Sequence, residues 1–290
     1  MNKPINKTFL IIGADSKIGK YVWKKFQNSS NINLIGTSYK NSNFFKLDLN
    51  NLNKLDNLIP KPVGKSVALF FAGKSVHSYC EKYPEETRHI NVTQTLKLTE
   101  ILNSYGYSTV HFSSTHVFSG EKAFMKIHEP TNPKSIFGQQ KAELEKILLS
   151  TDNNMIIRVT KILNLFDNPF ADWILNLKSN SVITPYKDYP ISPISVTSFL
   201  SGISNIVQNS DNGLWHLGNS EQIDYAGIAI SLANKLNLNF RLVQETLNYE
   251  KLPHYPKYSS LDISATQQST RWIPENIEKA IDSTKIFFID

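Results

Sequence analysis

The segment from Gly13 to Gly19 carries the residue types that a phosphate-binding loop needs. It reads GADSKIG and directly follows the apolar run TFLII. Free N–H groups at the start of a helix attract phosphate, so a glycine turn between a strand and a helix is typical of dinucleotide-binding proteins. Gly13 would permit the tight turn, and Gly19 would let the helix pack closely on the strand. The predicted pyrophosphate site comprises Gly13, Asp15, Ser16, Lys17, Ile18 and Gly19.

Ser16 departs from the usual pattern of such loops. It occupies the middle position, where a glycine normally lets the phosphates approach the bare backbone. The additional Cβ and hydroxyl of a serine would either crowd the cofactor or donate a hydrogen bond to it. Both alternatives remain open from the sequence.

The second apolar run ends in Gly36-Thr37-Ser38-Tyr39-Lys40, which contains no acidic residue. An acidic residue at this place usually binds the 2′-hydroxyl of NAD, whereas basic and hydroxyl side chains accommodate the 2′-phosphate of NADP. Ser38 and Lys40 therefore favour NADP, with NAD as the alternative cofactor. A solvated loop with a chance lysine explains the same residues equally well.

A second candidate site lies in the segment NPKSIFGQQKAELEK, residues 132–146, which has a helical pattern. Phe137 and Lys141 are four residues apart, so they lie on the same face of that helix. Phe137 has no proton to donate and no hydrogen bond to offer.

Short apolar runs alternate with amphipathic stretches along the first half of the chain. Such alternation predicts an α/β fold, a doubly wound parallel-sheet Rossmann body with helices on both faces. After Thr160 the prolines 169, 185, 190 and 193 break the rhythm, which indicates a smaller, interleaved α/β substrate lobe. We assign residues 1–165 to the Rossmann domain, with 194–217 returning to it, and 166–193 and 218–290 to the lobe.

Composition excludes several classes of protein. The 290 residues carry 31 basic and 25 acidic side chains, a net charge of +6 that is scattered along the chain. This pattern favours small anionic ligands over nucleic acid, although it is also explained by solubility alone. The single cysteine favours a reducing cytoplasm, and the histidines lack the paired spacing of a metal site. The apolar runs are too short to span a membrane.

With these motifs in place, the chain resembles the dTDP-4-dehydrorhamnose reductase branch of the extended short-chain dehydrogenase/reductases. The likeness runs from end to end. Its main segments are the loop from Gly13 to Gly19, Asn91 in HINVTQTLKL, HFSSTHVFSG at 111–120, and NPKSIFGQQKAELE from residue 132.

The resemblance implies roles for the residues at the expected reaction centre. Ser114 would hydrogen-bond the substrate carbonyl, Lys141 would hold the nicotinamide ribose, and Asn91 would lie in the helix behind the site. Members of this family carry a proton-donating Tyr where Phe137 stands. His116 could replace that acid, because an imidazole with a pKa near 6.5 can donate a proton at neutral pH. A structural role is the alternative for His116.

Two further cofactor contacts follow from the resemblance. Phe71-Ala72-Gly73 replaces an Asn-Ala-Ala run that passes beneath the cofactor, so Ala72 and Gly73 are expected there. Asp48 lies where related enzymes contact adenine, and it could equally cap a helix beginning near Leu52.

The leading functional hypothesis is an NAD(P)-dependent nucleotide-sugar 4-ketoreductase-like protein without the usual catalytic Tyr. The alternative is a catalytically inactive nucleotide-binding or regulatory subunit on the same fold. A third hypothesis, a different sugar reaction with an acid from the substrate lobe, has less support. The expected ligand is a nucleotide-sugar-like molecule, and a homodimer or a partner enzyme is conceivable.

Overall fold

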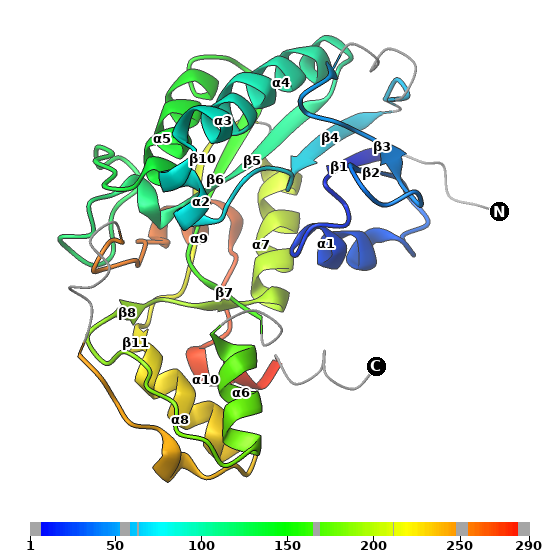
Figure 1. Ribbon diagram of the computed structural model, residues 1–290. Helices are drawn as coiled ribbons and strands as arrows, with labels where there is room; N and C mark the ends of the chain where they lie inside the picture. Colours follow the sequence, from blue (N-terminus) through cyan, green and yellow to red (C-terminus); the bar gives the residue numbers. More distant parts are fainter. Residues whose placement is uncertain are drawn as a thin grey trace. The chain divides into compact units, whose positions relative to one another are not determined.

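The computed structural model describes residues 7–52, 59–62, 64–164, 169–210, 212–247 and 255–283. The chain divides into two compact units, each built from separate segments (Figure 1). The first comprises Met1–Val117, Ser135–Arg158 and Val207–Trp215. The second comprises Phe118–Lys134, Val159–Ile206 and His216–Asp290. The chain therefore passes several times between the units.

The first unit is built on a sheet of seven strands among the described residues, in the order β10-β6-β5-β4-β1-β2-β3. The strands are β1 (Lys7–Ile12), β2 (Ile32–Ser38), β3 (Phe45–Lys46), β4 (Lys65–Phe70), β5 (Ser108–Ser114), β6 (Asn154–Val159) and β10 (Gly213–Leu217). Strands β3, β2, β1, β4 and β5 pair in parallel in that order. The order reverses next to β1, which is the arrangement of a Rossmann-like fold.

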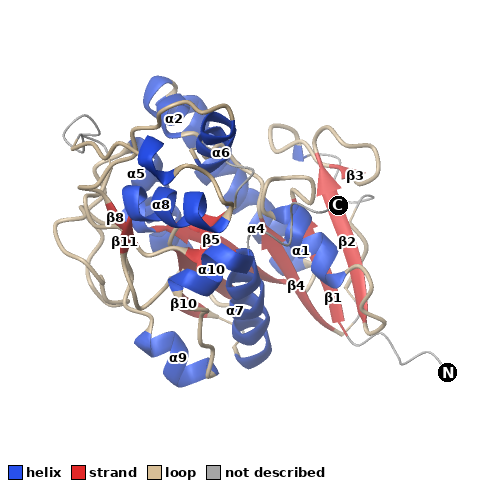
Figure 2. Ribbon diagram, turned by 90° about the horizontal axis from the view of Figure 1, so that it is seen from below, coloured by secondary structure: helices blue, strands red, loops and turns tan. Residues whose placement is uncertain are grey.

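Helices cover both faces of this sheet (Figures 1 and 2). On one face lies α1 (Gly19–Phe26), where the rings of Phe9 and Phe26 meet edge to face at 5.0 Å. The opposite face is covered by α4 (Thr95–Ser104) and α5 (Ile136–Leu148). Successive side chains of β1 point to opposite faces, so Phe9 and Leu10 belong to different layers of the core.

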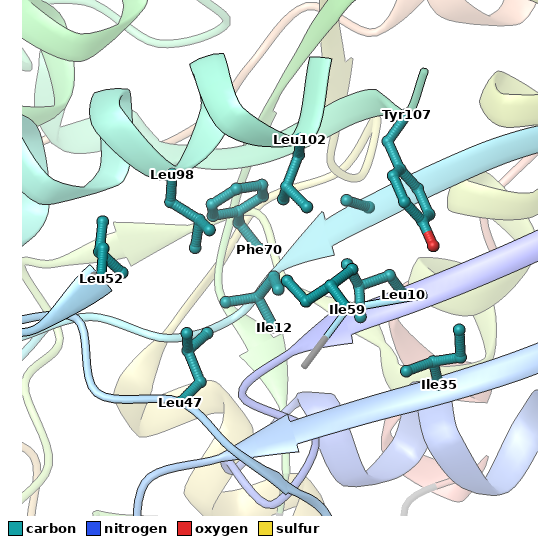
Figure 3. Close-up of a cluster of buried hydrophobic side chains, with 11 residues drawn as sticks. Leu10, Ile12, Ile35, Leu47, Leu52, Ile59, Phe70, Leu98, Leu102 and Tyr107 are labelled. Atoms are coloured by element: carbon teal, nitrogen blue, oxygen red, sulfur yellow. The ribbon is translucent and has the colours of Figure 1, made fainter. Parts of the chain in front are cut away.

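Figure 3 shows the core between the sheet and α4. Leu10 and Ile12 of β1 and Phe70 of β4 meet Leu98 and Leu102 of the helix, and all five are buried. Burying aliphatic and aromatic side chains of this size contributes about 1.5–3 kcal/mol each. This layer holds β1 and β4 against α4. It therefore also positions the loops that follow the two strands.

The helix α5 is tied to the sheet by a buried ion pair. The side chains of Arg158 on β6 and Glu145 on α5 are about 5% exposed, and the guanidinium Nη2 donates to a carboxylate oxygen at 2.7 Å. Removing one partner of such a pair leaves an uncompensated charge and typically costs about 3–5 kcal/mol. The pair therefore fixes the helix that carries Phe137 and Lys141.

The second unit contains short strands and helices. The strands are β7 (Ile162–Leu163), β8 (Pro190–Ile191), β9 (Ile194–Ser195) and β11 (Ile223–Asp224), which form two-stranded pairs β7-β9 and β11-β8. The helices are α6 (Phe170–Lys178), α7 (Val196–Asn209), α8 (Tyr225–Lys235), the 3₁₀ turn η4 (Phe240–Leu242), α9 (Ser264–Thr270) and α10 (Ile277–Ser283). Phe170, Ile174, Ile228 and Leu232 join α6 and α8 in one apolar cluster.

The structure confirms the predicted Rossmann-like α/β fold with a mostly parallel sheet. Between β4 and β5 the chain forms α2 (His77–Lys82), α3 (Pro84–Arg88), a π turn η2 (His89–Gln94) and α4 in succession. The predicted helix beginning near Leu52 falls on residues 53–58, outside the described residues. The assignment of Rossmann and substrate domains stays a prediction. No described helix is long and apolar enough to cross a membrane.

Candidate active site

The loop after β1 has the backbone that the sequence predicted. Gly13 has φ +85°, and a Cβ there would lie only 2.8 Å from the backbone N of Ala72. At Gly19, a Cβ would collide with the carbonyl oxygen of Gly13. Both positions therefore require glycine, because the turn folds back on itself and passes close to the end of β4.

The hydroxyl of Ser16 faces the start of helix α1. Its Oγ accepts a hydrogen bond from the N–H of Gly19 at 3.0 Å, and the residue is partly exposed. The serine thus satisfies one of the first N–H groups of the helix, as a capping residue does. Its hydroxyl proton remains available to donate outward, so the hydroxyl can contribute to an anion site at this helix end.

The end of β2 is joined to the phosphate loop by a hydrogen bond that connects residues 23 positions apart. Ser38, only 2% exposed, donates from Oγ to Oδ2 of Asp15 at 2.6 Å. Ser38 Oγ also accepts hydrogen bonds from the N–H groups of Lys40 at 3.1 Å and Asn41 at 2.9 Å. Lys40 itself is exposed. An acidic group therefore stands at the end of β2 after all, supplied by the loop after β1.

The loop after β4 brings Ala72 and Gly73 next to the glycine turn. Phe71 continues the strand pairing by donating its N–H to the carbonyl of Ile12 at 2.8 Å, and its ring stacks on Phe112 with centroids 4.5 Å apart. Gly73 has φ +151°, and a Cβ there would approach Oδ1 of Asn91 to 3.1 Å. The backbone after β4 is thus held open beside the phosphate loop.

Asn91, on the π turn, braces this loop. Its Oδ1 accepts from the N–H of Lys74, and its Nδ2 donates to the carbonyl of Lys74 and to Oε1 of Gln140, each at 2.8 Å. Gln140 donates in turn to Oγ1 of Thr87 at 2.9 Å. A π turn displaces one residue from the regular helix pattern and often occurs at functional sites. Sequence reasoning missed Gln140, because nothing in its spacing pointed to Asn91.

Asp48 makes a local turn contact. Its Oδ1 accepts from the N–H of Asn50 at 2.9 Å, and the side chain is partly buried. This hydrogen bond is typical of an Asx turn. Both predicted roles of Asp48, adenine contact and helix cap, stay predictions.

Phe137 lies in an aromatic group with two histidines. Its ring centroid is 4.7 Å from that of His77 and 6.1 Å from that of His116, and the two histidine rings are 4.2 Å apart. Phe137 is 7% exposed. The three residues come from α2, from the turn η3 (Thr115–Val117) and from α5, and we call them the aromatic trio. Sequence reasoning gave His77 no role, since it lies 39 positions before His116.

Lys141 lies one turn after Phe137 on α5, as the spacing predicted. Its Nζ is 5.7 Å from the centroid of the Phe137 ring and donates to the carbonyl of Phe112 at 2.9 Å. Burial lowers the pKa of Lys141 to about 8, while the carboxylate of Glu145 opposes this shift. The ammonium is therefore close to its titration point at mildly alkaline pH.

Ser114 and His116 follow at the end of β5. Ser114 is partly exposed, and its Oγ accepts from the N–H of His116 at 3.3 Å. Burial, and to a smaller extent the neighbouring His77, lowers the pKa of His116 to about 3. The imidazole is therefore neutral at pH 7, so a role as general acid requires a bound ligand that raises its pKa. That role stays a prediction.

The second unit contains an open cavity of about 560 Å³ beside the start of α8. Lys187, Asp188, Asp224, Lys257 and Tyr258 are among its lining residues. Asp224 caps the helix by accepting from the N–H of Gly227. In the described part of the chain, no group of three or more His, Cys, Asp or Glu residues could hold a metal ion.

Comparisons with known proteins agree with this geometry. The family model of the RmlD substrate binding domain matches residues 7–285. A dTDP-4-dehydrorhamnose reductase of Aggregatibacter actinomycetemcomitans is 23% identical over 296 residues, covering 96% of this chain and 98% of that relative. Methionine adenosyltransferase 2 subunit beta of Bos taurus is 26% identical over 159 residues, which span 54% of this chain and 46% of that relative.

Solved structures extend the likeness of the fold. The dTDP-4-dehydrorhamnose reductase of Bacillus anthracis, solved in complex with NADP, has a TM-score of 0.87 at 18% identity, covering 98% of this chain and 99% of that one. The UDP-glucose 4-epimerase of Thermotoga maritima, solved with UDP-glucose, has a TM-score of 0.82 at 15% identity, covering 97% and 98%. At such identities the structural likeness establishes the fold. The match of the family model over nearly the whole length establishes more: this chain belongs to the RmlD substrate binding domain family.

Proposed function

We propose that this protein binds a nicotinamide dinucleotide and is a nucleotide-sugar 4-ketoreductase-like protein of the dTDP-4-dehydrorhamnose reductase type. NADP is the proposed cofactor, with NAD as the alternative, and the proposed substrate class is a nucleotide-linked 4-keto sugar. The observation that carries the proposal is that one compact unit contains the glycine turn after β1, Ser114 at the end of β5 and Lys141 on α5, and that Lys141 Nζ donates to the carbonyl of Phe112, two residues before Ser114. The family match and the NADP complex of the Bacillus anthracis protein support it.

The residues of the phosphate loop fit a dinucleotide. The close approach at Gly13 and Gly19 leaves no room for side chains, and Ser16 keeps a hydroxyl proton at the start of α1. Asp15 and Lys17 are exposed and Ile18 is partly exposed, so this side of the turn is accessible to a ligand. We assign the pyrophosphate to the start of α1, where the positive end of the helix dipole favours anions.

The other proposed contacts with the dinucleotide come from the loops and the helix that follow β2, β4 and β5. Lys40 would meet the adenosine ribose at the end of β2, and Ala72 and Gly73 would line the loop after β4. Lys141 would hold the nicotinamide ribose. Asp48 is assigned to the adenine side, where its carboxylate already accepts a backbone hydrogen bond.

Bound NADPH would supply hydride to a carbonyl carbon. Ser114 is the proposed donor to the carbonyl oxygen, because its hydroxyl is partly exposed at the end of β5. A positioned general acid typically contributes about 10²- to 10⁴-fold in rate. Phe137 cannot act as one, and His116 is neutral before ligand binding. We therefore expect carbonyl reduction that is slow by the usual route.

The cavity beside α8 is a candidate site for part of the sugar nucleotide. Lys187 and Lys257 supply positive charge there, although Lys187 also pairs with Glu245. Assignment of this unit as the substrate lobe is part of the proposal.

A second function deserves the same test: a catalytically inactive nucleotide-binding or regulatory subunit. Two observations favour it. Phe137 is buried in the aromatic trio at the place where a proton donor would be needed, and half of the chain is similar to the beta subunit of methionine adenosyltransferase 2.

The test has two steps. NADPH and NADH are first titrated against the purified protein, with cofactor fluorescence and melting temperature as readouts. If neither cofactor binds, both proposed functions fail. If one binds, NADPH consumption is followed with a nucleotide-linked 4-keto-6-deoxy sugar. Measurable turnover supports the reductase, whereas binding without turnover supports the regulatory subunit.

A further inference from the structure

The carboxylate of Asp15 stands at the place where dinucleotide-binding proteins read the adenosine ribose. In such proteins, an acidic residue at the end of the second strand normally accepts a hydrogen bond from the ribose 2′-hydroxyl. Here β2 ends at Ser38, and the hydroxyl of Ser38 donates to Oδ2 of Asp15 at 2.6 Å. The acid therefore comes from the phosphate loop and is held at the end of β2 by the last residue of that strand.

The geometry leaves the carboxylate accessible. Asp15 is exposed, whereas Ser38 is almost completely buried. The hydroxyl of Ser38 also accepts from two N–H groups, those of Lys40 and Asn41, so its proton is directed toward Asp15. Ser38 is thus fully used within the protein, and its hydroxyl is a poor candidate for direct contact with a 2′-phosphate. Asp15 retains acceptor capacity for a ligand hydroxyl.

Charge then decides between the two cofactors. A ribose 2′-hydroxyl can donate to a carboxylate, which is a charge-assisted hydrogen bond. A 2′-phosphate at the same place would bring like charges together, which opposes binding. Lys40, exposed two residues after Ser38, acts in the opposite direction by attracting a phosphate.

We propose that Asp15, held by Ser38, is a specificity residue that recognises the adenosine 2′-hydroxyl, so that the protein accepts NADH beside NADPH. The proposal rests on the dinucleotide binding proposed above and adds which residue sets the preference. Lys40 acts in the opposite direction, because its positive charge attracts the 2′-phosphate of NADPH. The protein therefore also binds NADPH.

The test compares dissociation constants for NADPH and NADH in the wild type and in Asp15→Asn. We expect the variant to shift the ratio of the two affinities toward NADPH by about tenfold, which corresponds to ~1.4 kcal/mol. Lys40→Ala should shift the ratio in the opposite direction. Asp152→Asn, in the exposed turn before β6, is the matched control and should leave the ratio unchanged.

ADP-ribose and its 2′-phosphate serve as second probes, because they lack the nicotinamide and report on the ribose site alone. They should show the same shift in Asp15→Asn. A merely structural role for Asp15 would weaken both probes equally and leave their ratio unchanged, and that result would overturn the proposal. Melting temperatures of both variants confirm that they are folded.

The outcomes separate this inference from the proposed function. If the wild type binds one or both cofactors but Asp15→Asn leaves the ratio unchanged, only the role of Asp15 is wrong. If the wild type binds neither cofactor nor ADP-ribose, the proposed dinucleotide binding fails as well.

Discussion

At the scale of single residues, the proposed chemistry depends on whether a proton donor stands at position 137. Phe137 and a tyrosine have nearly the same shape, but only a phenol can donate a proton to a developing alkoxide. Phe137 packs on His77 within the aromatic trio and is nearly fully buried. A hydroxyl added to such a ring is stabilising only if it finds a hydrogen-bond partner.

We expect Phe137→Tyr to increase the rate of NADPH consumption by about 10²- to 10⁴-fold, because it restores a general acid one helical turn before Lys141. The measurement is the turnover rate with a nucleotide-linked 4-keto sugar. The same change at exposed Phe45 is the matched control. A variant that binds NADPH but consumes none would contradict the idea that only the proton donor is missing.

A second prediction concerns the charge of Lys141. Because its pKa is lowered to about 8, the ammonium predominates at neutral pH, is half lost at about pH 8 and is lost as the pH rises further. We expect the affinity for NADPH to fall above pH 8, since a hydrogen bond from a charged group contributes about 1.5–3 kcal/mol. Titrations between neutral pH and pH 10 measure this.

The control for that titration is Lys141→Met, which should bind NADPH more weakly and without a pH step in this range. A wild-type affinity that stays constant across the titration would show that Lys141 does not contact the cofactor, or that binding raises its pKa beyond the range.

At the scale of elements, the site depends on how loops are held between strands and helices. The loop after β4 is held by the π turn, because Asn91 bonds both backbone groups of Lys74 and also reaches Gln140 on α5. One side chain therefore joins three elements. The glycine turn after β1 lies against the same loop through Ala72.

We expect Asn91→Ala to reduce the free energy of unfolding by about 1–3 kcal/mol, because it leaves buried polar groups of the loop and of Gln140 unsatisfied. Urea unfolding measures the effect, and Asn43→Ala, at an exposed position, is the control. The variant should also bind NADPH more weakly. Unchanged stability and binding together would mean that water replaces the amide without cost.

At the scale of the whole molecule, buried histidines link stability to pH. His111 is 3% exposed and its ring nitrogen lies within hydrogen-bond distance of Thr99 and Thr109. Burial, and secondarily the charge of Lys141, lowers its pKa to about 3. Between pH 6.5 and 3 the unfolded chain binds a proton that the folded protein excludes. Stability is therefore fully present above pH 6.5 and falls as the pH decreases through this window.

We expect the free energy of unfolding to decrease by about 2 kcal/mol between pH 6.5 and pH 5 through His111 alone, because each pKa unit corresponds to ~1.4 kcal/mol. His111→Gln should reduce this slope, and the slope that remains includes His116, whose pKa is also lowered to about 3. Equal slopes in the wild type and the variant would show that His111 does not control the acid transition.

The sequence determined the fold class and the local geometry of the glycine turn after the first strand. Apolar strand runs, their alternation with helical patterns and the GADSKIG turn predicted the parallel sheet and the phosphate loop, because hydrophobic periodicity and glycine geometry are local properties. The spacing of Phe137 and Lys141 likewise fixed their common helix face.

Tertiary structure alone decided which distant residues meet. Asp15 reaches the end of β2 through Ser38, and His77 lies on the rings of His116 and Phe137. No local pattern encodes these contacts, since they arise where the loops after different strands converge at one edge of the sheet. The same packing lowers the pKa of His116 and of Lys141, because desolvation depends on what surrounds a group and not on its place in the sequence.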